Sequence, residues 1–249
     1  MRYLFNRVNE LKARLKGKYI FIFLDCDGTL APIANSPEEA VIPKKTRRLL
    51  ESLSGEKLCQ VAVISGRALS DIKSKVGLKN IIYSGNHGLE IEGSKIRFIT
   101  PVSPGYQKLI QGIKRDLNKK IASIKGAFVE DKGLSLAVHY RQVKKKDVSL
   151  LKTVFHETII FHLVSDKVKI RFGKKVLEVR PSVKWDKGKA VLWLLALQQF
   201  SRAGGNVFPI YIGDDLTDED DFKVLEQIGI TVFVVQPKHS QAQYFVKNK

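Results

Sequence analysis

Unbroken apolar runs that end in polar residues constrain the fold of this 249-residue chain more than any other feature. The clearest run covers residues 19–25, where six apolar residues precede a carboxylate. Four further runs lie at residues 59–65, 81–84, 208–213 and 230–235. A strand that lacks polar–apolar alternation is buried on both faces, which is typical of parallel sheets. The runs therefore predict the strands of a buried parallel sheet.

Segments with helical periodicity separate these runs along the chain, at residues 43–53, 69–76, 188–200 and 219–228. Strands that alternate with helices predict crossover connections and helices on both faces of the sheet. We therefore expect a Rossmann-like, doubly wound α/β core. An amphipathic helix is predicted near the start of the chain, because apolar residues recur there at helical spacing: Leu4, Val8, Leu11 and Leu15.

The middle of the chain follows a different pattern, in which one helix and two strands are followed by another helix and two strands. The expected elements lie at residues 105–121, 127–130, 135–140, 146–163, 168–172 and 176–179. This order predicts an α+β unit inserted into the core. We place the insertion at residues 103–180, so that residues 1–102 and 181–249 form the core.

The composition describes a globular protein with an excess of positive charge. Apolar residues make up 44% of the chain, and the formal net charge is +18. Nucleic-acid binding is one explanation, since phosphate neutralisation uses many Lys and Arg residues. However, the cations are scattered and few aromatic residues lie among them, which favours a solvated surface or a field that steers an anionic substrate. We expect neither a nucleic-acid partner nor a membrane.

Cysteine usage and the start of the chain bear on the compartment. The two cysteines, Cys26 and Cys59, have neither zinc-site spacing nor the pattern of a disulfide framework. The first residues lack the apolar run and cleavage site of a secretory signal, and no apolar stretch reaches the ~20 residues that would cross a bilayer. We therefore expect a cytoplasmic location.

Polar residues stand at the carboxyl ends of four predicted strands, where sites form in open parallel sheets. The acidic ones would gather negative charge in a small volume: Asp25, Asp27, Asp214, Asp215 and Asp218. Oxygen-rich carboxylate clusters favour Mg²⁺ over zinc. Beside such a cation, Asp25 could attack phosphorus and Asp27 could serve as acid and base, while Ser65 and Lys187 hold phosphoryl oxygens.

Each of these motifs alone has an ordinary structural explanation. An Asp at a strand end is commonly a turn or cap residue, and Ser65 with Gly66 could be a simple turn. The acidic segment 213–220 could be a loop with a helix N-cap at Thr217. The combination of these motifs, in this order and at these strand ends, favours a catalytic site over a set of unrelated turns and caps.

The motifs resemble those of the haloacid dehalogenase superfamily of phosphatases, namely DCDGTLAPI, ISGR, Lys187 in WDKGKA, and GDDLTDED. The inserted α+β unit resembles their class IIB cap. More narrowly, the chain resembles the trehalose-6-phosphate phosphatases, in the segments SGNHGLE, VEDKGLSLAVHYR, KKVLEVRP and GDDLTDEDDF. These segments and the first motif span most of the chain, from Asp25 to Phe222.

The resemblance implies a role for individual residues. Asp25 would be the nucleophile and Asp27 the acid and base, with Mg²⁺ on Asp25, the Asp27 main-chain carbonyl and Asp214. Asp215 and Asp218 would orient the metal ligands. Substrate contacts would come from residues of the inserted unit: Glu130, Lys132, Arg141, Lys174 and Glu178. Arg67 and His87 would either contact the substrate as well or brace the core.

The implied function is Mg²⁺-dependent hydrolysis of trehalose 6-phosphate to trehalose and phosphate through an aspartyl-phosphate, by a monomer that acts in trehalose biosynthesis. Three alternatives stay open at this point. The chain could be another class IIB phosphatase, acting on sucrose 6-phosphate, mannosyl-3-phosphoglycerate or a phosphorylated monosaccharide. It could be a basic nucleic-acid-binding protein. It could be a catalytically silent regulator, although the presence of Asp25, Asp27, Lys187 and Asp214 together argues against that.

Overall fold

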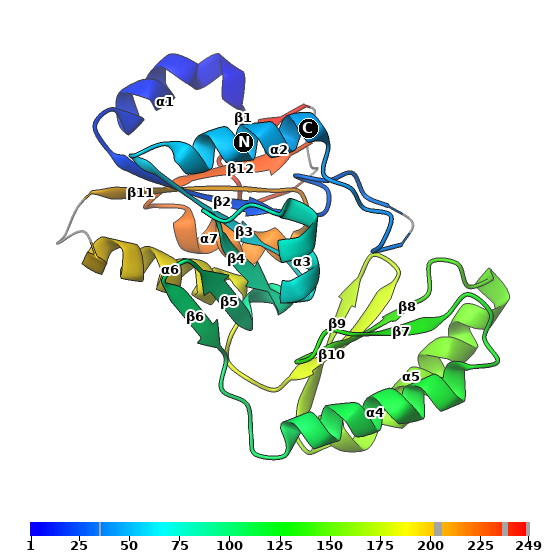
Figure 1. Ribbon diagram of the computed structural model, residues 1–249. Helices are drawn as coiled ribbons and strands as arrows, with labels where there is room; N and C mark the ends of the chain where they lie inside the picture. The colour runs from blue at the N-terminus through cyan, green and yellow to red at the C-terminus, as the bar shows by residue number, and fades with distance from the viewer. Residues whose placement is uncertain (35, 202–205, 236–238, 248–249) are drawn as a thin grey trace. The chain divides into compact units, whose positions relative to one another are not determined.

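The computed structural model describes residues 1–34, 36–201, 206–235 and 239–247 (Figure 1). The chain divides into two compact units. The first, which we call the core unit, comprises Met1–Ile99 and Trp185–Lys249. The second, the inserted unit, is Thr100–Lys184, where the sequence predicted an insertion at residues 103–180.

A nine-stranded sheet forms the centre of the core unit (Figure 1). In the spatial order given below, the strands from the β1 edge of the sheet as far as β4 all pair in parallel. The central strands are uniformly apolar because helices cover the sheet on both faces. In spatial order the strands are β1 (Arg2–Tyr3), β13 (Tyr244–Val246), β12 (Ile230–Val234), β11 (Val207–Gly213), β2 (Tyr19–Asp25), β3 (Cys59–Ile64), β4 (Ile82–Gly85), β5 (Glu90–Gly93) and β6 (Ile96–Ile99).

The predicted α/β class and parallel core are confirmed, but the sheet also has an antiparallel edge that was not predicted. There β5 and β6 form an antiparallel hairpin beside β4. Both hairpin strands are four residues long and contain charged residues. They are partly exposed and therefore lack the continuous apolar run that identifies the buried strands. The edge strands β1 and β13 were not predicted either, because they are only two and three residues long.

Two hydrophobic layers hold the helices to the sheet, because side chains alternate along β2. Phe21 and Phe23 pack with residues of α6 (Lys187–Ser201) and α7 (Glu219–Leu225). Leu24 and Cys26 pack on the opposite face with residues of α2 (Lys44–Gly55) and α3 (Leu69–Val76). Cys26 therefore points away from the face on which Asp25 lies.

The amino-terminal helix begins later than the sequence predicted. Residues Leu4–Arg7 form the 3₁₀ helix η1, and the α-helix α1 covers Val8–Leu15. Leu11 is buried in a cluster with residues of β11, β12 and β13. The helix therefore packs on the core, as its apolar spacing indicated. Within the described ranges, none of the helices is both long and apolar enough to span a bilayer.

The inserted unit is a two-layer α+β structure. Its sheet has the antiparallel order β7 (Phe128–Asp131), β8 (Leu136–His139), β10 (Val176–Pro181) and β9 (Val168–Gly173). The helices α4 (Tyr106–Ile121) and α5 (Val148–Val164) share one hydrophobic cluster with one face of this sheet. The other face carries most of the polar side chains of the strands, as alternation requires.

Candidate active site

The polar residues at the strand ends gather at one edge of the core sheet. Asp25 ends β2 and lies beside Ile64 of β3, so that Ser65 follows on the neighbouring strand. On the other side of β2, Ile212 pairs with Leu24, and Asp214 follows two residues later. The parallel register therefore brings Asp25, Ser65 and Asp214 to the same end of the sheet, as the sequence predicted.

Lys187 joins two acidic side chains from different parts of the chain. Its Nζ donates to Oδ1 of Asp25 at 2.8 Å and to Oδ1 of Asp218 at 2.9 Å. All three residues are buried. Burial lowers the pKa of Lys187, but the charges of Asp218 and Asp25 outweigh that effect and hold the pKa well above its ordinary value. Lys187 is therefore a permanent cation in this cluster.

Asp218 organises the loop that follows β11. Its Oδ1 also accepts from Tyr211 Oη at 2.8 Å, and its Oδ2 accepts from the main-chain N–H groups of Asp214 and Asp215 at 3.1 and 3.0 Å. Asp215 is the N-cap of the 3₁₀ helix η4 (Leu216–Asp218) and forms a capping box with Asp218. The cap of this segment is thus Asp215 and not Thr217, which was the alternative considered from the sequence.

Three carboxylates could hold a divalent cation. Asp25, Asp214 and Asp218 each offer an oxygen, and these oxygens lie within 4.8 Å of one another. Burial raises the pKa of Asp25 well above its ordinary value, and the negative charges of Asp218 and Asp214 raise it further against the opposing effect of Lys187. A cation would favour the ionised carboxylate. The all-oxygen donor set fits a hard ion such as Mg²⁺.

Gly28 gives Asp214 the space to reach this cluster. Its φ is +106°, and a Cβ added at Gly28 would lie 1.9 Å from Oδ2 of Asp214. A side chain at position 28 would therefore displace a carboxylate of the acidic cluster. Thr29 helps to hold that carboxylate, because its Oγ1 donates to Asp214 Oδ1 at 3.2 Å.

For the phosphatase reaction that the sequence motifs predict, we expect Gly28→Ala to lower the rate at least about tenfold and to raise the Mg²⁺ concentration needed for half-maximal rate, since Asp214 must move. Gly17→Ala is the matched control. Gly17 also has positive φ, +72°, but nothing lies within 4 Å of an added Cβ. That variant should suffer only the backbone strain of about 1 kcal/mol and keep its activity. Normal metal dependence of Gly28→Ala would contradict the packing argument.

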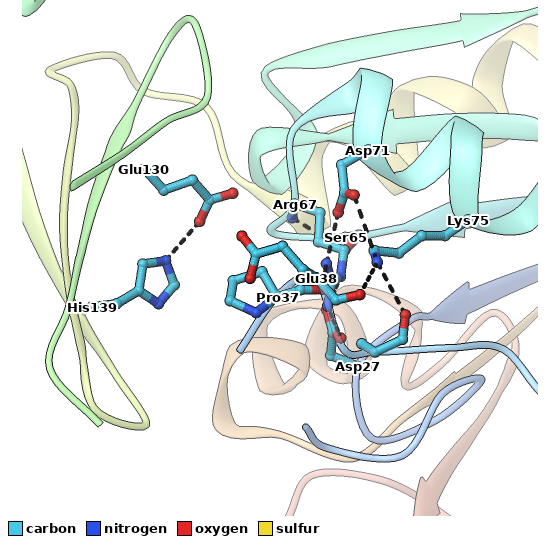
Figure 2. A network of polar contacts seen from close by, with 10 residues as sticks. Asp27, Pro37, Glu38, Ser65, Arg67, Asp71, Lys75, Glu130 and His139 are labelled. Atoms are coloured by element: carbon cyan, nitrogen blue, oxygen red, sulfur yellow. Dashed lines mark hydrogen bonds and ion pairs between the residues drawn. The ribbon is translucent and has the colours of Figure 1, made fainter. Parts of the chain in front are cut away.

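Arg67 holds the second aspartate of the first motif (Figure 2). Its Nε and Nη2 donate to the two carboxylate oxygens of Asp27, both at 2.7 Å. Its Nη1 donates to Asp71 Oδ2 at 2.6 Å and to the carbonyl of Pro37 at 2.9 Å. A bidentate pair of this kind fixes the carboxylate in direction as well as position. Arg67 thus contacts both oxygens of the Asp27 carboxylate.

Ser65 and His87 lie in the turns beside this network. Ser65 is buried, and its Oγ accepts from the main-chain N–H of Arg67 at 3.2 Å. His87 has the left-handed φ of +56°, and its N–H donates to the carbonyl of Ser65 at 2.9 Å. The imidazole lies against Gly66, where an added Cβ would be 2.3 Å from Nε2. His87 therefore packs directly on the turn that carries Ser65.

In the inserted unit, the register aligns polar residues of β7, β10 and β9 in one row across the sheet. Glu130 and Glu178 both pair with Ala137, and Arg171 pairs with Glu178 from the other side. Lys132 Nζ donates to Glu178 Oε1 at 2.9 Å. A separate pair joins His139 Nε2 and Glu130 Oε2 at 2.7 Å (Figure 2). The predicted residues Glu130, Lys132 and Glu178 thus belong to one polar sheet face.

The remaining predicted residues of this unit lie in turns. Arg141 Nη2 donates to the carbonyl of Lys174 at 3.1 Å, which connects the end of β8 to the turn between β9 and β10. Sequence reasoning missed three partners on the polar face: His139, Arg171 and Arg180. Arg180 donates to Glu178 from the same strand. Arg180 could have been predicted from the sequence, because residues 178 and 180 of one strand must lie on the same face of the sheet.

Comparison with known proteins agrees with this arrangement. The trehalose-phosphatase family model matches residues 23–249. The chain is 36% identical over 256 residues to trehalose-phosphate phosphatase B of Arabidopsis thaliana, covering 98% of this chain and 67% of that relative. It is 37% identical over 251 residues to trehalose 6-phosphate phosphatase RA3 of Zea mays, covering 94% of this chain and 68% of that relative. The chain thus spans about two thirds of the length of these relatives.

A solved structure shows the same fold. The C-terminal domain of trehalose-6-phosphate phosphatase from C. albicans matches with a TM-score of 0.80 and 25% identity, covering 98% of this chain and 92% of that one. A trehalose-6-phosphate phosphatase related protein matches with a TM-score of 0.74 at 22% identity, over 91% of this chain and 90% of that chain. The family model and the relatives match nearly the whole of this chain, and the chain therefore belongs to the trehalose-phosphatase family.

Proposed function

We propose that the protein hydrolyses trehalose 6-phosphate to trehalose and phosphate. The observation that carries the proposal is the cluster at the carboxyl edge of the sheet, in which the partly buried Asp214 joins the buried residues Asp25, Lys187 and Asp218. Its chemistry suits phosphoryl transfer, which needs positioning and charge stabilisation more than covalent reactivity. Family membership supports the choice of sugar.

In this proposal Asp25 attacks phosphorus and forms an aspartyl-phosphate, while the sugar oxygen leaves. Asp27, held by Arg67, delivers the proton to the leaving oxygen and then takes one from the hydrolytic water. Ser65 and Lys187 hold phosphoryl oxygens. Mg²⁺ would be held by Asp25, the main-chain carbonyl of Asp27 and Asp214, with Asp215 and Asp218 fixing the loop behind it. When bound, the ion neutralises charge on the phosphoryl group and on the carboxylates.

Phosphate release from a panel of sugar phosphates, with and without EDTA, tests the proposal. We expect the highest kcat/KM with trehalose 6-phosphate, and lower values with sucrose 6-phosphate, mannosyl-3-phosphoglycerate and glucose 6-phosphate. Excess EDTA should remove the activity, and added Mg²⁺ should restore it. A higher kcat/KM with another sugar phosphate would overturn the substrate assignment. Undiminished turnover in EDTA would overturn the metal assignment.

The inserted unit would act as the substrate-recognition cap of the enzyme. The polar sheet face offers paired carboxylates and cations, which suit sugar hydroxyls because these are both donors and acceptors. In this role we place Glu130, Lys132, Arg141, Lys174 and Glu178, with Arg67 and His87 contributing from the core. A closed cap would also exclude bulk water from the reaction.

Glu178→Ala and Lys132→Ala should lower kcat/KM for trehalose 6-phosphate at least about tenfold. The rate with a small aryl phosphate should change less than about twofold, because that substrate lacks the sugar. Lys152→Ala, an exposed cation on α5 of the same unit, is the matched control and should leave both rates unchanged. Equal losses on both substrates would contradict a role in sugar recognition.

We further propose that the enzyme acts as a monomer in the cytoplasm and uses neither nucleic acid nor a membrane as partner. The cysteines support a reducing compartment, since Cys26 and Cys59 both carry free thiols. The sugar-phosphate substrate is a sufficient reason for a positive surface, because a net charge of +18 favours the approach of small anions.

A further inference from the structure

A cavity in the core unit lies at the other end of the sheet from Asp25. Its volume is about 650 Å³, within the range of small-molecule sites. Gln60, near the start of β3, lines it. The register pairs Gln60 with Phe21, four residues before Asp25 on β2, which is a separation of roughly 13 Å along the strand. The cavity is therefore distinct from the acidic cluster.

Its described lining contains cations and neutral polar groups but no carboxylate. Lys95 and Arg97 come from the hairpin of β5 and β6, and both are exposed. Glu92, which lies opposite Arg97 in the hairpin, is ion-paired with Lys73. A lining of this kind is unfavourable for a cation and favourable for an anion.

The neutral part of the lining suits a hydroxylated ring. Asn80 and Gln198 provide carboxamides that can donate and accept hydrogen bonds. Gln60 offers its amide oxygen as an acceptor, because its Nε2 donates to the main-chain carbonyls of Val61 and Asn80. Trp193 also lines the cavity, and its ring packs against Phe98 with a centroid distance of 4.8 Å. That contact holds the half-buried indole in place. A fixed indole combines an apolar face with a polar N–H, and both can contact the ring of a sugar.

We propose that this cavity is a binding site for a small phosphorylated sugar, separate from the catalytic site. The Arg97 guanidinium and the Lys95 ammonium would bind the phosphate, for which Arg has matching bidentate geometry. The carboxamides would bind the hydroxyls, and Trp193 would cover one side of the ring. The same chemistry fits a hexose monophosphate and a phosphorylated disaccharide. The inference rests on the cavity and not on the proposed reaction.

Titration of the intact chain with glucose 6-phosphate, followed by the indole N–H signals in NMR spectra, tests this site. The chain contains two tryptophans, so the signal lost in Trp185→Phe identifies the other as Trp193. We expect glucose 6-phosphate to shift the Trp193 signal saturably, and glucose or inorganic phosphate alone to bind at least tenfold more weakly. A parallel titration with trehalose 6-phosphate in EDTA shows whether the mono- or the disaccharide phosphate binds more tightly.

The double variant Lys95→Gln/Arg97→Gln should weaken this binding at least tenfold and leave kcat and KM for the substrate unchanged. Lys44→Gln/Arg48→Gln is the matched control, because it removes two exposed cations of the same unit that do not line the cavity. An unmoved Trp193 signal would overturn the proposal. So would equal binding by the cavity variant and the control. Neither result would bear on the activity of the catalytic site.

Discussion

Replacing Asp25 with Asn is expected to lower phosphate release about a thousandfold or more, while the protein remains folded. An amide is a very poor nucleophile towards phosphorus, so the covalent step should fail. The fold should persist because Asn has the same shape and Lys187 still pairs with Asp218. Rates should be measured with saturating Mg²⁺, and circular dichroism should verify the fold.

Asp116→Asn is the matched control for this experiment. Asp116 is an exposed residue of α4 in the inserted unit, and the same change of atoms there should leave the rate unaltered. If purified Asp25→Asn retains near-normal turnover with Mg²⁺, another group must attack phosphorus. The assignment of Asp25 would then be wrong.

Lys187→Met is expected to have the largest effect on stability. It removes the cation between two buried carboxylates, and breaking a buried ion pair from one side costs about 3–5 kcal/mol. The side chains of Lys187, Asp25 and Asp218 are at most 9% exposed, so solvent screening offers little relief. Urea unfolding without Mg²⁺ should report the loss in free energy of unfolding. Turnover should also be lost.

Added Mg²⁺ should restore part of the stability that Lys187→Met loses. A bound cation stabilises the folded state, and it offsets the repulsion between the carboxylates that Lys187 no longer neutralises. Lys189→Met is the matched control on the same helix. Lys189 is exposed and its ion pair with Asp186 lies at the surface, so its removal should cost no more than about 1 kcal/mol. Equal destabilisation by the two substitutions would show that the buried cluster has no special role in folding.

The helices and strands that could be predicted are those whose burial follows from the pattern of apolar residues within the element itself. The apolar run of β2 predicts burial on both faces, and the helix at residues 69–76 was predicted with the bounds that the structure gives. The hairpin of β5 and β6 could not be predicted in this way. Its stability comes from pairing with β4 and from packing of Phe98 between Trp185 and Trp193, which are contacts from elsewhere in the sequence.

The same distinction applies to the site. Parallel register makes the meeting of Asp25 and Asp214 predictable once the strands are assigned. The roles of Arg67 and Asp218 were harder to predict, because each depends on several side-chain distances. Arg67 binds Asp27, 40 residues away, and Asp218 accepts from Lys187 and from Tyr211 as well as from its own loop. Sequence order does not encode which of several nearby carboxylates a cation will contact.

Detection of phosphate on Asp25 tests the central claim most directly. Asp27→Asn should slow hydrolysis of the intermediate, because it removes the base that activates water. That variant can be mixed with an aryl phosphate and Mg²⁺, because a phenolate leaves without the proton that Asp27 would supply to a sugar oxygen. The mixture is then quenched in acid and reduced with borohydride, which converts an acyl phosphate of aspartate to homoserine. We predict homoserine at residue 25, found by mass spectrometry and absent without substrate. Phosphate trapped on a different residue during turnover would contradict the account.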